Sequence, residues 1–327
     1  MATETLATIM IILLCWIMLI AADVVISGFV SILTGVAFRK VFLWGLLSLT
    51  IPPVTVVYGA LWERNRFEVQ EVEIACNSLP EDFDGYRIVH ISDIHSRSFI
   101  GRETSLERAV KTINGLEADL IAFTGDLITM APDELSGISP ILKGLRAKDG
   151  IVSILGNHDY CQYTDADQAT KDRYLEELIT QEKQMGWELL LNENRIIRHG
   201  NDSIAVIGVE NTSPSRHFPS KGDLSKASQG TEGMFHILLS HDPMHWEHEI
   251  TGKDYPLTLS GHTHAMQVTL FGWSPSSLIF KQNQGLYTSG DQYLYVNIGL
   301  GETIFPARIC ARPEITLITL TKQSKNI

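Results

Sequence analysis

The stretch "YPLTLSGHTHAMQ" at residues 255–267 joins an apolar run to two closely spaced histidines, His262 and His264. The run has the length and composition of a buried strand, and Gly261 follows it directly. In an extended segment, residues two apart point to the same face, so both imidazoles project to one side. Two polar rings at the end of a buried strand require polar or metallic partners.

Four other short apolar runs also lead directly into residues that can bind a metal ion. The runs are "RIVHIS" (87–92), "DLIAFT" (119–124), "GIVSIL" (150–155) and "FHILLS" (235–240). The candidate ligands that follow them are Asp93, His95, Asp126, Asn157 and His241. Since the carboxyl ends of strands in an open α/β sheet meet at one crevice, we expect all seven candidate ligands to lie together.

Helical patterns separate the early strands, whereas the later part of the chain is rich in strands. Residues 104–116 have an apolar stripe at helical spacing, with Thr104 and Glu107 at the spacing of a capping box. Residues 171–186 form a second amphipathic pattern that ends at Gly186. Later apolar runs that predict strands lie at 203–209, 257–260, 293–299 and 314–320. This order predicts an α/β fold in which two sheets pack face to face with helices outside.

The candidate ligands combine carboxylates, an amide oxygen and imidazoles, without a thiolate. This donor set favours Mn²⁺, with Fe²⁺ and Zn²⁺ as alternatives, and argues against copper(I) and iron–sulfur clusters. Seven ligands are too many for one tetrahedral ion. They fit two divalent metal ions, with one carboxylate bridging them.

Two neighbouring metal ions are an arrangement suited to phosphoryl transfer, because they polarise phosphate oxygens and lower the pKa of a shared water. The resulting hydroxide is the expected nucleophile. His158 follows the ligand Asn157 and can protonate the leaving oxygen, and Asp159 is predicted to orient the His158 ring.

The N-terminal part of the chain contains two long uncharged stretches, Thr5–Ala22 and Val41–Trp62. As a helix, the second stretch spans about 33 Å, enough for the core of a bilayer. We expect two transmembrane helices, the second kinked at Pro52 and Pro53. The alternative for the first stretch is a cleaved signal peptide, but no positive charge precedes it.

These helices divide the chain into a membrane anchor, 1–66, and a catalytic domain, 67–327. Both ends of a two-helix anchor lie on one side of the membrane, and basic residues do not distinguish the sides. The four cysteines lack metal-binding spacing and are expected to be free thiols, which favours a reducing compartment and hence the cytoplasmic face. The net charge of −12 argues against nucleic acid as a partner.

The motifs "SDIH" (92–95), "TGDL" (124–127), "GNHD" (156–159), "SHDP" (240–243) and "SGHTH" (260–264), in this order, resemble those of the calcineurin-like metallophosphoesterase superfamily. "ILLSHDPMHW" (237–246) and "RPEITLITL" (312–320) are similar to its membrane-associated bacterial branch of YkuE-like and YaeI-like phosphodiesterases. The resemblance implies a four-layer α/β/β/α sandwich.

It also implies a role for each matched residue. The first metal takes Asp93, His95 and His264, the second takes Asn157, His241 and His262, Asp126 bridges, and His158 is the acid near the leaving group. The chain departs from purple acid phosphatases, which place a tyrosine ligand where this sequence has Thr129. A tyrosinate-bound ferric ion is therefore not expected.

The substrate is less well defined by the sequence. Arg97 could bind a substrate phosphate as a bidentate donor, and Asn211 could shape the mouth of the site. The aromatic segment "LFGWSPSSLIF" (270–280) is either part of the core or an apolar wall for a lipid chain.

We therefore expect a membrane-anchored phosphodiesterase or pyrophosphatase acting on a phosphorylated small molecule or a lipid-linked phosphate. One alternative, from related members of the superfamily, is a UDP-2,3-diacylglucosamine pyrophosphatase of lipid A biosynthesis. Another is a non-catalytic interaction module of the same fold.

Overall fold

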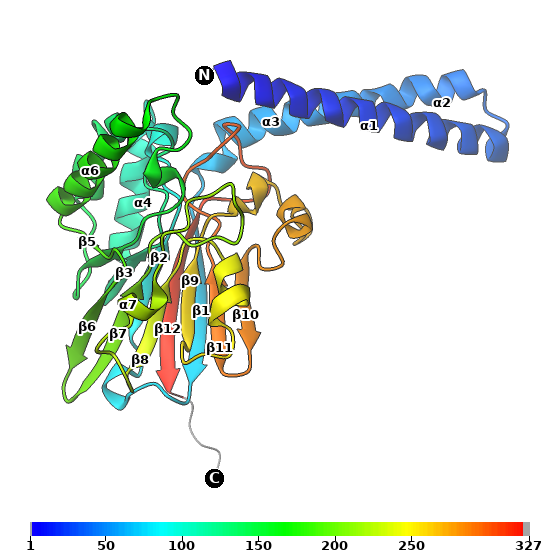
Figure 1. Cartoon of the computed structure of the whole chain (residues 1–327). Helices are drawn as coiled ribbons and strands as arrows, with labels where there is room; N and C mark the ends of the chain where they lie inside the picture. The colour runs from blue at the N-terminus through cyan, green and yellow to red at the C-terminus, as the bar shows by residue number, and fades with distance from the viewer. Residues whose placement is uncertain (1, 323–327) are drawn as a thin grey trace, which may run out of the picture.

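The computed structural model describes residues 2–322 as a helical hairpin attached to a layered α/β domain (Figure 1). The helices are α1 (Ala2–Thr34), α2 (Phe38–Gly45), α3 (Ile51–Leu61), α4 (Glu103–Gly115), α5 (Ser139–Leu142), α6 (Gln168–Met185) and α7 (Leu224–Ala227). Short 3-10 and π turns connect several of these helices and strands.

Twelve strands form two six-stranded sheets. In spatial order, the first sheet contains β1 (Glu68–Cys76), β12 (Glu314–Lys322), β2 (Arg87–Ile91), β3 (Leu120–Phe123), β4 (Ile151–Ser153) and β5 (Glu188–Leu189). The second contains β10 (Gly285–Ser289), β11 (Gln292–Val296), β9 (Leu257–Ser260), β8 (Phe235–Leu239), β7 (Asp202–Gly208) and β6 (Glu193–His199). Strands β2 to β5 are mutually parallel, as are β7, β8, β9 and β11.

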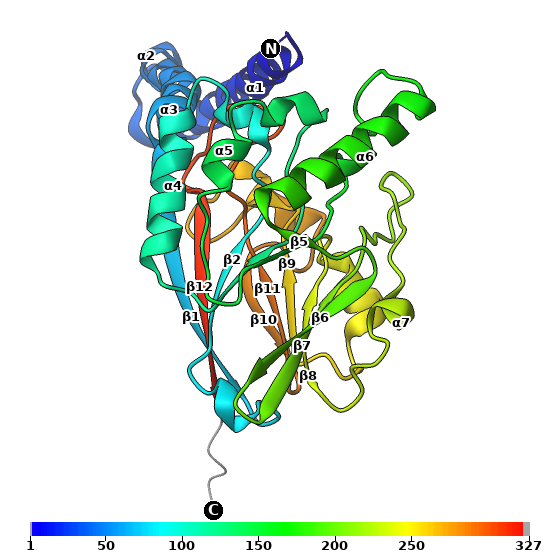
Figure 2. The same ribbon diagram turned by 90° about the vertical axis from the view of Figure 1, so that its left-hand side faces the viewer.

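The predicted four-layer α/β/β/α sandwich is confirmed. Apolar residues of both sheets form the central core, as shown by Ile88 and Val152 packing in one cluster with Ile204 and Ile237. Helices α4, α5 and α6 cover the outer face of the first sheet (Figure 2). The fourth layer is thin: among residues 2–322, α7 and the π turn at Trp246–Ile250 are the helical segments that pack on the outer face of the second sheet.

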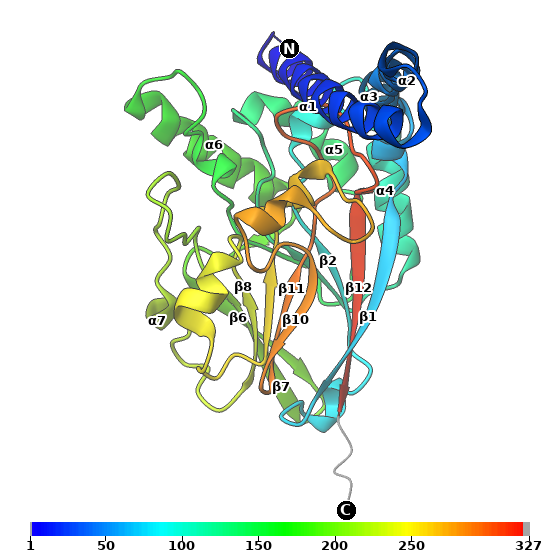
Figure 3. The ribbon, with the colours of Figure 1, turned by 90° about the vertical axis from the view of Figure 1, so that its right-hand side faces the viewer.

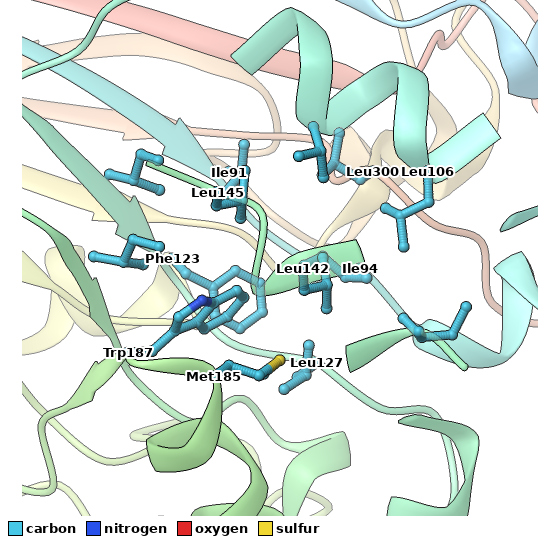
Figure 4. Packing of buried hydrophobic residues seen from close by; sticks show 14 of the residues in the cluster. Ile91, Ile94, Leu106, Phe123, Leu127, Leu142, Leu145, Met185, Trp187 and Leu300 are labelled. Atoms are coloured by element: carbon cyan, nitrogen blue, oxygen red, sulfur yellow. The ribbon is translucent and has the colours of Figure 1, made fainter. Parts of the chain in front are cut away.

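The core beneath the helices of the first sheet is closely packed (Figure 4). The ring of Phe123 on β3 lies 5.3 Å from that of Trp187, and both belong to a cluster that includes Leu106 of α4 and Leu178 of α6. The predicted helices are therefore present. The apolar stripe of α4 is buried, whereas in that of α6 Leu178 is buried and the other members are half-buried. The capping box is wrong: the N-cap is Arg102, without a side-chain cap.

Glu182 of α6 is a buried carboxyl in this core. Its side chain accepts a hydrogen bond of 2.7 Å from Ser153 of β4. Burial, aided by the negative charge of Asp159, raises the pKa of Glu182 from 4.5 to about 8. The folded protein therefore retains a proton on Glu182 that the unfolded chain releases above pH 4.5.

Because of this raised pKa, the parent protein should lose stability as the pH rises from about 4.5 to 8. Glu182→Gln has no ionisable group at this position and should not show this loss. Above pH 8 the free energy of unfolding of the variant should exceed that of the parent by a few kcal/mol, because a change of one in the pKa corresponds to about 1.4 kcal/mol. Urea unfolding of the full chain in detergent at several pH values measures this. Glu176→Gln, at an exposed site on the same helix, serves as the control. Parallel pH profiles for parent and Glu182→Gln would contradict the prediction.

The two predicted apolar helical stretches are present as an antiparallel hairpin (Figure 1), and their crossing of a membrane stays a prediction. Thr5–Thr34 and Phe38–Asn65 are long and apolar enough to cross a membrane, and little of either is buried. Arg39 and Lys40 lie in the first turn of α2. A 3-10 segment, Leu46–Thr50, interrupts the second span, and Pro52 and Pro53 follow in the first turn of α3. A kink at these prolines stays a prediction.

One charged side chain lies within the hairpin and is shielded by it. Asp23 of α1 is buried and accepts a hydrogen bond of 3.0 Å from Ser27. It packs against Gly45 of α2, where any side chain would collide with the carboxylate. Trp16 donates to the carbonyl of Leu49, which further joins the two helices. Among the described residues, the Oδ2 atom of Asp23 has no hydrogen-bond partner, so the hairpin shields this carboxylate but satisfies only part of its hydrogen-bonding capacity.

The foot of the hairpin, Gly59–Asn65, is held against the domain by side-chain contacts. Glu63 is buried and accepts from Arg312 at 2.8 Å. The Asn65 side-chain oxygen accepts from Arg102 at 3.0 Å and from Ser105 at 2.9 Å. The division between residues 66 and 67 stays a prediction, but it falls just after residues that bond to the domain.

Candidate metal centre

The seven predicted ligands lie at the carboxyl ends of β2, β3 and β4 in one sheet and of β8 and β9 in the other. All seven follow their strands directly, so the local backbone decides where they point. Five of them have positive φ angles, namely Asp93 (50°), His95 (44°), Asp126 (59°), His262 (72°) and His264 (50°). Such left-handed conformations are uncommon for residues with side chains and cluster at functional sites.

Glycines let these loops approach one another. A side chain at Gly261 would collide with Ser92 and the Asp93 carboxylate, and one at Gly156 would collide with the Asp126 carboxylate. The lack of a side chain at Gly261 therefore gives the backbone room to approach Ser92 and Asp93. Substitution at either glycine would push a candidate ligand out of place.

Asp93, His95 and His264 form the first ligand set. The Nε2 atoms of His95 and His264 are 3.1 Å apart, and the His264 Nε2 atom lies 3.2 Å from Asp93 Oδ1. All three side chains are buried. Their donor atoms therefore converge on one point away from solvent.

Asp126, Asn157, His241 and His262 form the second set. The Nε2 atom of His241 lies 3.1 Å from Asn157 Oδ1, 3.2 Å from Asp126 Oδ2 and 3.3 Å from His262 Nδ1. The same Oδ2 atom of Asp126 is 3.6 Å from the Nε2 atom of His95 in the first set. Asp126 thus lies between the sets, in the position of a bridging carboxylate.

The donor atoms of both sets fit metal ions. The Nδ1 atom of His241 donates to the Thr124 carbonyl at 2.7 Å, which directs the lone pair of its Nε2 atom into the site. The Nε2 atoms of His95 and His264 face each other at hydrogen-bond distance, and burial together with His158 holds the pKa of His95 well below its usual value. Lone pairs that converge in a buried space are stabilised by a cation between them.

The carboxylates make the same space attractive to positive charge. Burial opposes ionisation of Asp93, yet the adjacent His264 holds the pKa of Asp93 below its usual range. Burial also opposes protonation of His241, but Asp126 raises the pKa of His241 to about 10. Asp93 and Asp126 therefore favour positive charge on the neighbouring imidazoles, and a bound divalent cation would take the place of those protons.

His158 lies beside both sets. Its ring centroid is 4.8 Å from that of His95, and its Nδ1 atom is 2.8 Å from the carbonyl oxygen of Thr129. With Nδ1 donating to the backbone, the Nε2 atom is the one left for exchange of a proton. Thr129 therefore orients His158, and its hydroxyl also lies 3.4 Å from His95 Nδ1.

The prediction that Asp159 orients the His158 ring is wrong. Among the described residues, the Asp159 carboxylate accepts hydrogen bonds from the backbone N–H groups of Gly156, Asp126, Leu127 and Ile128, at 2.8 to 3.1 Å. The residue is fully buried, and four N–H donors leave its oxygens no room for the ring. Asp159 is a positioning residue for the loop that carries Asp126.

Tyr163 is a part of the site that the sequence patterns did not reveal. Its ring stacks on His158 with centroids 4.2 Å apart, and its hydroxyl accepts a hydrogen bond of 3.0 Å from the Asn157 side-chain amide. That bond turns the Asn157 oxygen toward His241. Tyr163 therefore holds both the predicted proton donor, His158, and one candidate ligand, Asn157.

We expect Tyr163→Ala to lower kcat about 10- to 100-fold, the usual effect of removing a partner that orients a ligand. Tyr163→Phe keeps the stacked ring and loses only the bond to Asn157, so its loss should be smaller. Steady-state kinetics and the metal content of both variants measure this. Unchanged kcat in Tyr163→Ala would show that neither contact matters.

Arg308 also supports the site without touching the ligand atoms. It is fully buried, and burial lowers the pKa of its guanidinium to about 10. The guanidinium donates to the carbonyls of Gly299 and Ala311 at 2.9 and 3.1 Å. The neighbouring Gly301 N–H donates to the Asp93 carbonyl at 2.8 Å, so Arg308 holds this loop against the first ligand set.

The two predicted substrate contacts lie outside the ligand sets. Arg97 lines a cavity of about 620 Å³ beside Thr129, together with Ile100 and Ile304. Asn211 is buried and donates to the Pro219 carbonyl at 2.6 Å. Contact of either residue with a substrate stays a prediction.

Phe218 and Phe280 flank His262, with ring centroids 4.9 and 5.4 Å from the imidazole. The sequence patterns did not indicate this contact. These rings narrow the approach to the second ligand set from the side of the second sheet.

Comparison with known proteins agrees with this geometry. The model of the calcineurin-like phosphoesterase family matches residues 86–266. The chain is 33% identical over 273 residues to the uncharacterized metallophosphoesterase YkuE of Bacillus subtilis, covering 80% of this chain and 88% of that one. It is 34% identical to a transmembrane protein with metallophosphoesterase domain of Danio rerio, covering 84% of this chain and 62% of that protein.

A more distant relative carries a specific name. The UDP-2,3-diacylglucosamine pyrophosphatase LpxG of Chlamydia trachomatis is 26% identical over 326 residues, covering 83% of this chain and 94% of that protein. The relatives named as transmembrane proteins and the two apolar helices together indicate that the chain associates with a membrane.

Proposed function

Because the chain belongs to the calcineurin-like phosphoesterase family, we propose that it is a membrane-anchored hydrolase that cleaves a phosphodiester or pyrophosphate bond with two divalent metal ions. The observation that carries this proposal is the pair of buried ligand sets that share the Asp126 carboxylate. Asp93, His95 and His264 would hold the first ion, and Asn157, His241 and His262 the second, with Asp126 between them.

When bound, such ions supply Lewis acidity toward phosphate oxygens and lower the pKa of water. The residues of the chain do the rest. Thr129 keeps the Nδ1 atom of His158 occupied, so its Nε2 atom delivers a proton to the leaving oxygen. Asp159 and Tyr163 hold Asp126 and Asn157 in place while the substrate binds.

The donor set of nitrogen and oxygen atoms supports Mn²⁺ as the metal, with Fe²⁺ and Zn²⁺ as alternatives that availability would decide. Free cysteines support an orientation with the domain on the cytoplasmic face. The same geometry argues against a non-catalytic module, because every ligand position and the proton donor are filled and oriented.

A lipid-linked phosphate is the substrate class that we favour. The cavity of about 620 Å³ is lined by three arginines and three carboxylates, with apolar side chains beside them, namely Arg64, Arg97, Arg102, Asp133, Glu134, Glu302, Ile100 and Ile304. An amphiphile with a phosphate and an apolar tail matches such a lining. The distant similarity to LpxG makes UDP-2,3-diacylglucosamine a specific candidate.

Metal dependence tests the proposed reaction. Full-length protein in detergent with Mn²⁺ should hydrolyse bis-p-nitrophenyl phosphate, and a chelator should remove this activity completely. Return of the rate on addition of Mn²⁺ is expected, because all ligands come from the chain itself. Full activity after removal of measurable metal would overturn the two-ion mechanism.

The substrate class needs a separate experiment. Lipid extracts incubated with the protein and with His158→Ala should differ in a phosphorylated lipid or nucleotide-linked lipid, measured by mass spectrometry. Identical lipid pools would reject a lipid substrate while leaving metal-dependent hydrolysis intact.

A further inference from the structure

The segment Leu270–Ile279 exposes an unusual amount of apolar surface for a folded domain. Phe271 is fully exposed, Leu278 is 78% exposed and Ile279 is 61% exposed, while Leu270 and Trp273 are about half exposed. The sequence allowed either a core segment or an apolar wall, and a core position is excluded by this exposure. Contiguous apolar patches on a protein surface mark contact with a partner or a membrane.

This segment lies on the face of the domain from which the helical hairpin projects (Figure 3). Figure 1 shows it, in orange, as the part of the domain that reaches furthest in the direction of the hairpin. Hydrogen bonds account for this placement. Thr269 N–H donates to the Ile309 carbonyl at 2.9 Å, and Gln267 donates to the carbonyls of Phe305 and Ala307.

The strip 305–309 that receives these bonds also touches α3. Gly59 packs directly on the Arg308 carbonyl, where a Cβ would lie 2.5 Å from the oxygen. Arg64, three residues beyond the end of α3, donates to the Pro306 carbonyl at 3.1 Å. One short strip of backbone therefore connects the apolar segment to the foot of the second span.

Aromatic residues mark the level at which that span leaves the bilayer. Tyr58 and Trp62 stack with centroids 6.0 Å apart, and both are exposed. Arg39 and Lys40 mark the other end, and a helix from Arg39 to Trp62 is about 34 Å long. That length matches the hydrocarbon core, and aromatic rings favour its two interfaces.

We propose that Leu270–Ile279 is a second membrane contact, which enters the headgroup region of the leaflet at which α3 ends. Phe, Trp, Leu and Ile side chains are those that enter this region most favourably. We assign the exposed apolar surface of this segment to contact with the lipid bilayer rather than with a second copy of the chain. The contacts at the foot of α3 already hold this face of the domain beside the bilayer.

Basic residues gather at the same level. Five arginines line two adjoining cavities of about 620 and 400 Å³ around the foot of α3, namely Arg64, Arg66, Arg97, Arg102 and Arg108. Asp133, Glu134 and Glu302 also line the larger cavity, and Arg102 pairs with Glu302 at 3.1 Å. The five arginines therefore leave a local positive excess that these carboxylates offset only in part, in a chain whose net charge is −12. Anionic lipid headgroups would favour it, and apolar contact and charge then act together.

The membrane contact would place the metal centre at the leaflet surface. The apolar segment leads directly into Phe280, whose ring packs on His262 of the second ligand set. A phosphate ester anchored in the leaflet would then reach the centre without leaving the membrane. This consequence rests on the proposed function, whereas the membrane contact itself does not depend on hydrolysis.

Depth-dependent fluorescence quenching tests the contact without an activity assay. The full chain carrying Cys15→Ser and Cys310→Ser retains only the buried cysteines Cys76 and Cys161. Phe271→Cys or Leu278→Cys is then labelled with bimane and reconstituted in vesicles of phosphatidylcholine and phosphatidylglycerol containing brominated lipid. Asn201→Cys, at the exposed β6–β7 turn at the far end of the domain (Figure 1), is the matched control.

Quenching by brominated lipid should be several-fold stronger at positions 271 and 278 than at position 201. Equal, weak quenching at all three positions would overturn the proposal. Shielding of position 271 that depends on protein concentration, without lipid quenching, would assign the segment to contact between two copies and would also overturn it. The two labelled positions guard against failure of one variant to fold.

Discussion

Asp126→Asn should reduce hydrolysis of bis-p-nitrophenyl phosphate by about 1000-fold or more, because one carboxylate serves both ligand sets. The Asp126 Oδ2 atom lies 3.2 Å from His241 and 3.6 Å from His95 in the structure. Loss of a bridging carboxylate would weaken the stabilisation of charge at both ions and raise the activation free energy by several kcal/mol. Each 1.4 kcal/mol in the activation free energy lowers the rate about tenfold. The amide keeps the shape of the side chain and removes only its charge.

Metal analysis gives this prediction a second measurement. The variant should retain fewer than two ions per chain after gel filtration, whereas Asp291→Asn, an exposed carboxylate on the β10–β11 turn, should behave as the parent. The Asp126 Oδ1 atom also accepts from the His158 N–H at 2.8 Å, and the amide can preserve that bond. Two tightly bound ions and parental activity in Asp126→Asn would exclude a bridging role.

His158→Ala should have an effect that depends on the leaving group. For an ester of a sugar or alkyl alcohol, loss of the proton donor is expected to lower kcat about 100- to 10,000-fold. For a p-nitrophenyl ester the loss should be small, since p-nitrophenolate departs without a proton. The Thr129 carbonyl fixes the ring for this single task, because it occupies Nδ1 and leaves Nε2 toward the site.

A comparison of the two ester classes separates this role from a structural one. His217→Ala, at an exposed position on the loop after β7, is the control and should change neither rate. Metal content should be unchanged in His158→Ala, because His158 is not among the seven ligands. Equal losses on both ester classes would mean that His158 holds the metal ions or the substrate rather than donating a proton.

The candidate metal ligands could be predicted because each lies shortly after a buried strand, and the carboxyl ends of the strands converge by topology. The strands that the sequence patterns did not predict lack such apolar runs. They are β1, β5, β6 and β10, which are the four edge strands of the two sheets. Edge strands need one buried face at most, so their sequences lack the continuous apolar runs that revealed the central strands.

Residues that support the ligands were also beyond the reach of sequence patterns. Asp159 stands next to His158 in the chain, yet its carboxylate turns to the backbone of the Asp126 loop, 33 residues away in the sequence. Arg308 donates to backbone carbonyl groups, which every residue has, so no complementary side chain in the sequence indicates its role. Long-range contacts of this kind depend on the packing of loops that only the folded structure defines.

The contacts at the foot of the hairpin have a practical consequence for biochemical work on this protein. A soluble version that begins at residue 67 would lack Glu63 and Asn65, which partner Arg312 and Arg102 in the structure. Truncation should instead begin just ahead of Glu63, after the apolar span ends. A protein truncated in this way would keep the partners of Arg312 and Arg102. If a version that begins at residue 67 is poorly soluble, the loss of these partners, rather than an unstable domain, is the expected cause.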